Sequence, residues 1–220
     1  MLNLPLPSLM PEIARRPDDL PGGLSNCVGR TIRANGMLHG DMDHDVARRL
    51  ASGWMGVVRF LVDGRRQVIH ILLPGDLLGT NALMTDPAQS AAVALTRAMV
   101  ALAGPVGEQE RQEHTRRMIW CMQNQICRIG RQSAYERIAN LFAELLDRLT
   151  IIGQAHGDTF DMPLTQDVLG DTLGLTSVHV NRTLQQMRRD GLIRLSGRTV
   201  TLLDRPAVER IGEYRPLPRD

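Results

Sequence analysis

The sequence predicts an α+β protein with two folded parts, and three observations carry this prediction. From Leu24 to about Pro105, short apolar runs alternate with glycines, which is typical of a β domain. After Gly107, about forty residues follow helical spacing. From Thr165 onward, two short helical runs precede two short β runs. We therefore expect a β domain, a long helix and a small α+β domain.

Length and composition limit the class of protein. The 220 residues suffice for two domains, and 43% hydrophobic with 23% charged residues is typical of globular proteins. No apolar stretch reaches the roughly 18 residues of a membrane span. Residues 1–23 are rich in proline, which suggests a loose arm or short helix, and they lack the pattern of a secretory signal. We expect a cytoplasmic protein that has no membrane association.

The total charge of the chain does not indicate a nucleic-acid site, so the positions of the charged residues matter. All 26 basic residues are arginine, because the chain contains no lysine, and the formal net charge is only +2. A biased codon supply is the simpler explanation of this composition, and selection for a planar, bidentate donor is the alternative. Any nucleic-acid site must therefore come from where the arginines lie.

The β domain, residues 1–106 with the N-terminal arm, shows its clearest pattern in "WMGVVRFLVDGRRQVIHILLPGD". Two runs rich in β-branched residues flank Asp63-Gly64, a strong hairpin signal. Pro74-Gly75 then predicts a turn.

The long helix, residues 107–132, carries two apolar lines. One line can pack within the chain while the other meets a twin helix, which favours a homodimer; a plain core helix in a monomer is the alternative. The residues predicted for the dimer contact are Met118, Ile119, Met122, Gln125, Ile126 and Ile129.

The third part, residues 133–220, begins with a capping box of Ser133 and Glu136. The core stripe of the helix that follows is Ile138, Leu141, Phe142, Leu145, Leu146 and Leu149.

Two further helices form a predicted helix-turn-helix. Thr165 caps a short helix, Gly174 permits a sharp turn, and Thr176 caps a second helix that ends near Asp190. The inward residues of the first helix are Val168, Leu169 and Leu173; in the second helix Val180, Leu184 and Met187 lie opposite Val178, Arg182, Gln185 and Arg189.

A β-hairpin wing follows in "GLIRLSGRTVTLLD", with its turn at Ser196-Gly197-Arg198. The combination of helix, turn, helix and wing predicts binding to duplex DNA. Residues predicted to contact bases are Ser177, Val178, Asn181 and Arg182, where Arg182 can donate twice to guanine. Residues predicted to contact the DNA backbone are Thr165, Thr176, His179, Gln185, Arg188, Arg189 and Arg198, with Arg194 beside them.

"LTQDVLGDTLGLTSVHVNRTLQQMRRDGLI" resembles the helix-turn-helix of the Crp/Fnr family of bacterial transcription regulators, and "SAYERIANLFAELLDRL" resembles the helix before it. "LASGWMGVVRFLVDGRRQVIHILLPGDLLG" is similar to the family's β-roll (jelly-roll-like) sensor domain. The resemblance implies a homodimer that recognises a palindromic site. It also implies base contacts by Arg182 and Asn181, while Val178 replaces the family's usual glutamate. Without that acceptor for cytosine, we expect a preference for T·A.

Family members that bind cyclic nucleotide carry Gly-Glu after the "PGD" turn and Arg-Ser a few residues later. Here Gly79 is followed by Thr80, and Gln89-Ser90 stands in the second place. Loss of both charged contacts makes cyclic AMP an unsuitable ligand. The iron–sulfur members hold their cluster with four cysteines; this chain has Cys27, Cys121 and Cys127 only, and we interpret the last two as small apolar residues of the long helix, with redox-responsive thiols as the alternative.

The segment "HGDMDHD", residues 39–45, suggests a metal site. Asp41, Asp43 and Asp45 match a calcium loop, but Val46 stands where glycine is required and Ser52 where a bidentate glutamate is required. A solvated acidic loop is the simpler interpretation, and a transition-metal site on its histidines is the alternative. We expect no metal and no cofactor.

Two other classes of function are weaker. An enzyme would need a nucleophile with its base, a metal set or a phosphate loop, and none occurs at a workable spacing. A small-molecule sensor could act through protein partners, with the winged helix as the interaction surface, but the arginines favour DNA. RNA polymerase is an expected further partner.

Overall fold

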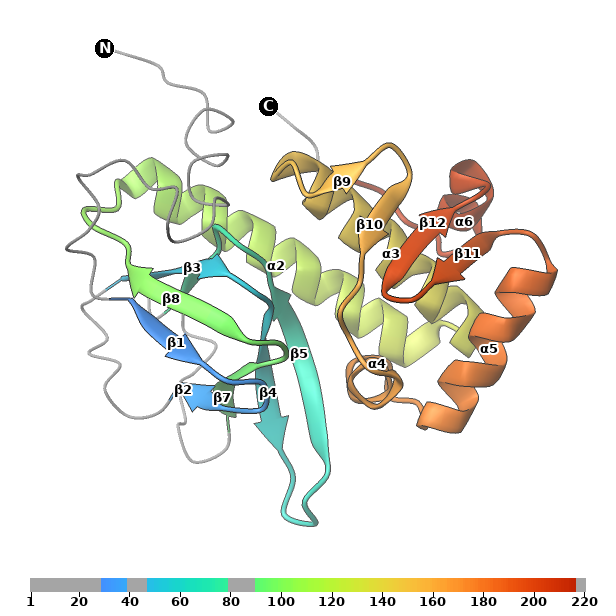
Figure 1. Cartoon of the computed structure of the whole chain (residues 1–220), viewed down its shortest axis with the longest axis horizontal. Helices are drawn as coiled ribbons and strands as arrows, with labels where there is room; N and C mark the ends of the chain where they lie inside the picture. The colour runs from blue at the N-terminus through green and yellow to red at the C-terminus, as the bar shows by residue number, and fades with distance from the viewer. Residues whose placement is uncertain (1–28, 39–46, 79–89, 217–220) are drawn as a thin grey trace. The chain divides into compact units, whose positions relative to one another are not determined.

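The computed structural model describes residues 29–38, 47–78 and 90–216. The chain divides into two compact units, Met1–Met118 and Ile119–Asp220, with the division inside a long helix (Figure 1). The finer division into three parts, with that helix as a separate part, stays a prediction. Among the described residues, no helix is long and apolar enough to cross a membrane.

The described residues of the first unit form two four-stranded antiparallel sheets. One sheet has the order β1-β8-β3-β6 and the other β2-β7-β4-β5. The strands are β1 (Arg30–Ile32), β2 (Met37–Leu38), β3 (Arg48–Ser52), β4 (Met55–Phe60), β5 (Arg66–Leu72), β6 (Leu77–Leu78), β7 (Ser90–Ala94) and β8 (Ala98–Leu102). Buried residues from both sheets form one core, which includes Ile32, Leu50, Met55, Leu72 and Val100.

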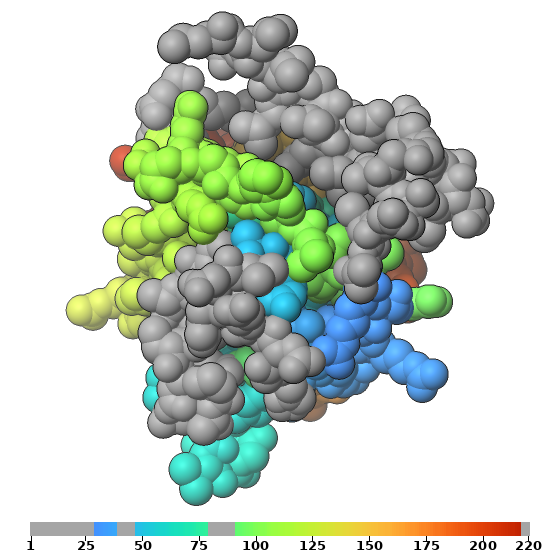
Figure 2. Space-filling view, turned by 90° about the vertical axis from the view of Figure 1, so that its left-hand side faces the viewer, coloured from blue at the N-terminus to red at the C-terminus, as the bar shows by residue number. Residues whose placement is uncertain are grey.

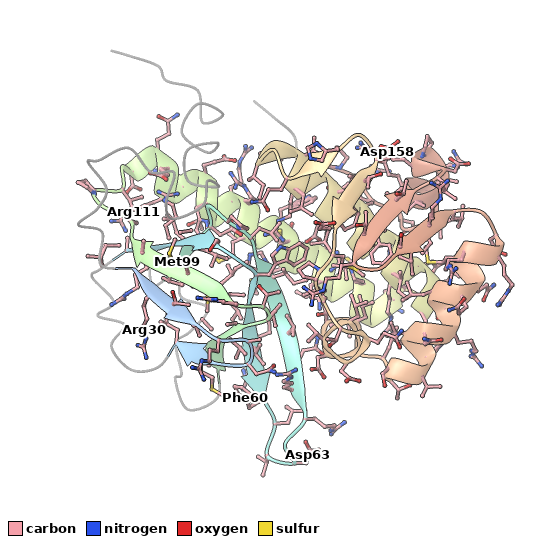
Figure 3. All side chains as sticks on the ribbon, in the orientation of Figure 1. Arg30, Phe60, Asp63, Met99, Arg111 and Asp158 are labelled. Carbon is pink, nitrogen blue, oxygen red and sulfur yellow. The ribbon has the colours of Figure 1, made fainter. Side chains whose placement is uncertain are left out.

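The predicted hairpin is present as β4 and β5, and its tip projects from the unit in both views (Figure 1 and Figure 2). The pairing ends at Phe60 and Arg66, so the loop has five residues. Asp63 lies at the tip (Figure 3), where its carboxylate accepts from the Arg65 backbone N–H at 3.0 Å. The predicted turn at Pro74-Gly75 is also present, because the Asp76 N–H donates to the Leu73 carbonyl.

Two helices follow, α2 (Glu108–Arg131) and α3 (Ala134–Ile151). The Ser133–Glu136 capping box begins α3 as predicted, since each side chain accepts from the other residue's backbone N–H. All six residues of the predicted core stripe of α3 are buried. This helix packs against the remaining helices of the second unit and against part of its sheet, so it forms the centre of that unit.

The second unit also contains α4 (Gln166–Leu173), α5 (Ser177–Arg189), α6 (Arg205–Ile211) and a sheet of order β11-β12-β10-β9. The predicted wing is β11 (Ile193–Ser196) and β12 (Thr199–Leu202), joined through Gly197 and Arg198. Sequence reasoning missed α6 and the hairpin of β9 (Ala155–His156) and β10 (Thr159–Asp161), although Gly157-Asp158 is a turn signal and Asp204 caps α6. Figure 3 shows Asp158 at that turn.

Candidate nucleic-acid interface

The first helix of the predicted helix-turn-helix is α4, which ends in a tight turn. The Thr165 hydroxyl accepts from the Val168 N–H and begins the helix. Gly174 ends it with φ of 65°, in the left-handed region where glycine is favoured. At Gly170 a Cβ atom would lie 2.5 Å from the Leu175 carbonyl oxygen, so a glycine is required for α4 to pack against the turn. These contacts fix the position of the helix that follows.

The second helix, α5, has one buried and one exposed face. The Thr176 hydroxyl accepts from the His179 N–H and begins the helix. The predicted inward residues Val180, Leu184 and Met187 are buried. On the opposite side the predicted outward residues are exposed, and Val178 is 77% exposed. A single exposed valine is common on protein surfaces, so Val178 is a candidate contact because of its position beside Asn181 and Arg182 on this face.

The four residues predicted to contact bases come from the first turns of α5. Val178, Asn181 and Arg182 are exposed, and Ser177 is half-buried. The Asn181 side chain is held by a neighbour: its Nδ2 donates to Oε1 of Gln166, the first residue of α4, at 3.2 Å. Sequence reasoning missed Gln166, because the two residues are brought together only by the angle between the two helices.

The residues predicted to contact the DNA backbone come from the N-caps of α4 and α5, from α5 itself and from the turn of the wing. Arg188 and Arg189 lie in the last turn of α5, and Arg188 donates to Gln185 Oε1 at 3.1 Å. Arg198 is exposed in the turn of the wing, where its carbonyl accepts from the Met162 N–H at 2.7 Å. Thr165 and Thr176 are also exposed, and His179 is half-buried.

A buried polar cluster connects α2 and α3 to the first helix of the helix-turn-helix. Arg128, at the end of α2, is 2% exposed and donates to Gln125, Asn140 and Glu144. Gln125 in turn donates to the Thr172 carbonyl of α4 at 2.5 Å. These contacts join the end of α2 to α3 and to α4. Periodicity alone could not reveal them, because it does not identify the partner of a buried polar side chain.

Tyr214, which follows α6, packs on α2 and α3. Tyr214 lies edge-on against Trp120 with ring centroids 5.8 Å apart, and its hydroxyl donates to Asp147 at 3.1 Å. Burial, with the negative charges of Asp147 and Glu144 nearby, raises the pKa of the Tyr214 phenol. Burial and a hydrogen bond to Asp190 likewise raise the pKa of Tyr135.

The residues predicted for a dimer contact lie on different sides of α2. Ile119 is 49% and Ile126 68% exposed, while Met122 and Ile129 are half-buried. Met118 and Gln125 are buried within this one chain. Ile119 and Ile126 are thus two large apolar side chains on α2 that the described part of the chain leaves exposed.

Several sequence-based expectations lie outside the described residues. Cys27, the acidic segment 39–45 and the positions Gly79, Thr80 and Gln89 are among them. Of the other two cysteines, Cys121 is buried as interpreted, whereas Cys127 is exposed. Within the described ranges, the histidine, cysteine and carboxylate side chains form no group of three or more that could hold a metal ion.

Comparison with known protein families finds two matching domain models. The Crp-like helix-turn-helix domain matches residues 136–211, which include α4, α5 and the wing. The cyclic nucleotide-binding domain matches residues 39–104, in the first unit. The cyclic nucleotide-binding match thus lies in the unit of two β-sheets, and the helix-turn-helix match lies in the second unit.

Curated relatives and solved structures agree with these matches. The chain is 30% identical to the nitrogen fixation regulation protein FixK of Rhizobium meliloti (strain 1021), over 83% of each chain. It is 29% identical to the transcriptional activator protein FnrL of Cereibacter sphaeroides, over 70% of this chain and 67% of the relative. The structure of FixK2 from Bradyrhizobium japonicum superposes with a TM-score of 0.69 at 25% identity, covering 84% of this chain and 96% of FixK2.

Proposed function

Since the chain belongs to the Crp/Fnr family of transcription regulators, we propose that it is a homodimer that recognises a palindromic DNA site through α5. Regulators of this family bind DNA and act as dimers, and they are not enzymes. The observation that carries the proposal is the exposed face of α5, which presents Val178, Asn181 and Arg182 opposite a fully buried apolar face. A helix with this division can enter the major groove while its other face holds it in the domain.

We assign base contacts to the first turns of α5. Arg182 has the donors to bind guanine O6 and N7 together, and the exposed Val178 can contact a thymine methyl group. Ser177 and Asn181 lie beside them. Arg188, Arg189 and Arg198 then contact phosphates and fix the register, with smaller contributions from Thr165, Thr176, His179 and Gln185.

We assign the dimer contact to α2. Ile119 and Ile126, with the half-buried Met122 and Ile129, offer apolar side chains that a twin helix would cover. Gln125 and Met118 support the contact from within their own chain, where both are buried. In such a dimer, the two α2 helices would determine the separation of the two α5 helices.

The first unit would receive the signal, although it lacks the charged residues that the family uses for cyclic AMP and the four cysteines that it uses for an iron–sulfur cluster. We infer that neither is its ligand and that the protein contains no cofactor. A regulator of this kind acts on chromosomal DNA in the cytoplasm, with RNA polymerase as a further partner.

Affinity for duplex DNA, measured as a function of salt concentration, tests this proposal. Several phosphate contacts predict a linear fall of log K with log salt, with a slope of about −0.9 for each phosphate. A protein that used the winged helix to bind another protein would show weak binding to DNA at every salt concentration. That result would favour the alternative function, a sensor that acts through protein partners.

A further inference from the structure

Asn181 and Gln166 connect the two helices of the helix-turn-helix by a hydrogen bond between their amides. Asn181 Nδ2 donates to Gln166 Oε1 at 3.2 Å, and both side chains are exposed on the side that faces away from the core. Gln166 is the first residue of α4, directly after the capping residue Thr165. A residue of the first helix therefore contacts a residue to which we assign a base contact.

Each of the two amides has hydrogen-bonding groups that their mutual hydrogen bond does not use. The Asn181 amide has two N–H donors and one carbonyl oxygen, and the bond to Gln166 uses one donor. The remaining acceptor and donor match N6 and N7 of adenine in the major groove. Gln166 uses its oxygen for Asn181, so both donors of its Nε2 are available to a phosphate oxygen at the start of α4.

We propose that Gln166 is a positioning residue that orients the Asn181 amide for adenine and also donates to a backbone phosphate. The proposal rests on the proposed function, since it places α5 in the major groove. A free asparagine amide rotates about χ2 and exchanges its oxygen and nitrogen positions. The bond to Gln166 selects one orientation before DNA binds, so less side-chain freedom is lost on binding.

Two substitutions of Gln166 separate the two parts of this role. Gln166→Glu keeps an acceptor for Asn181 but removes both donors and adds a negative charge. Gln166→Ala removes the acceptor as well. Gln112→Ala is the matched control, because Gln112 is an exposed glutamine whose side chain donates to Glu108 on α2.

A symmetric duplex is first selected from a random library, and the base pair at which Asn181→Ala abolishes the protein's base preference is identified. The measurement is then the affinity of the full-length protein for duplexes that differ at this base pair. We expect Gln166→Ala to weaken binding to every duplex and to reduce the preference for adenine roughly tenfold. Gln166→Glu should weaken binding to every duplex but retain the preference for adenine. Gln112→Ala should change neither.

A double-mutant cycle completes the test. In the Asn181→Ala background, Gln166→Ala should no longer change base preference, because the side chain that it orients is absent. The positioning role is overturned if Gln166→Ala retains the adenine preference, if it changes preference equally in both backgrounds, or if Asn181→Ala alters preference at no base pair. A wild-type protein without any sequence preference would contradict the proposed function itself, and the wild-type measurement alone identifies that case.

Discussion

The Arg128 guanidinium and the Glu144 carboxylate form a buried ion pair, with Nη2 and Oε2 2.5 Å apart and side chains 2% and 4% exposed. Arg128 belongs to α2 and Glu144 to α3, and Gln125 extends the contact to the carbonyl of Thr172 in α4. The end of the proposed dimer helix is thus joined to the helix-turn-helix by buried hydrogen bonds.

Arg128→Ala should lower the free energy of unfolding by about 3 kcal/mol, because it removes the buried hydrogen bonds that Arg128 donates to Gln125, Asn140 and Glu144 and leaves a cavity, although Arg148 still pairs with Glu144. Urea unfolding measures this value. Arg131→Ala, an exposed arginine at the end of the same helix, is the control and should change it by less than about 0.5 kcal/mol. Equal losses for the two variants would mean that the ion pair does not stabilise the unit.

Arg182→Ala should reduce affinity for the selected site by about 1–3 kcal/mol and relax discrimination at one base pair, since a bidentate contact to guanine is lost. Competition binding on duplexes varied at single positions measures both effects. An equal loss on specific and random DNA would contradict a base contact.

Arg198→Ala should weaken binding to all sequences alike, because we assign this residue of the wing to a phosphate. The slope of log K against log salt should also become shallower by about 1. A change in base preference with an unchanged salt slope would instead indicate a base contact for Arg198.

Val178→Glu should change the base preference at one pair from T·A towards a pair that presents cytosine, because a carboxylate can accept from cytosine N4 where a methyl group cannot. Selection from a random duplex library, carried out with both proteins, measures the change. Identical selected sites would show that residue 178 does not contact a base.

The stability of the second unit should fall as pH rises above about 10, where free phenols ionise. The pKa of Tyr214 is raised in the folded protein by burial, so above pH 10 the unfolded chain binds fewer protons than the folded one and stability decreases. The chain has no lysine and only two tyrosines, so few other side chains titrate there. Urea unfolding from pH 9.5 to 11.5 should show a steeper decline for the wild type than for Tyr214→Phe; parallel declines would contradict this account.

The helix-turn-helix was predictable because its signals are local. The capping threonines at 165 and 176, Gly174 and the apolar spacing of α5 all act within a few residues, and each has its predicted place. Pairing in the first unit was not predictable in this way. Arg30 of β1 pairs with Val100 of β8, and local patterning does not determine partners so distant in the chain.

Sequence-based prediction was also limited for polar residues, because helical spacing does not tell which neighbour a polar side chain contacts. Gln125 fits the apolar line of α2 by spacing, and its place in a dimer contact stays a prediction; the hydrogen bond from its amide to Thr172 in its own unit could not be read from that spacing. The Gln166–Asn181 contact was beyond sequence reasoning for the same reason, since the crossing of α4 and α5 brings the two amides together. Helical spacing identifies a face but not what that face meets.

The central claim, that a dimer recognises a palindrome through two α5 helices, is tested most directly by selecting a random duplex library with the purified full-length protein and sequencing the bound fraction. The account predicts an enriched palindrome whose half-sites are centred about 10 base pairs, one turn of DNA, apart. Enrichment of a single unpaired half-site, or no enrichment both alone and with cell extract added to supply an effector, would contradict it.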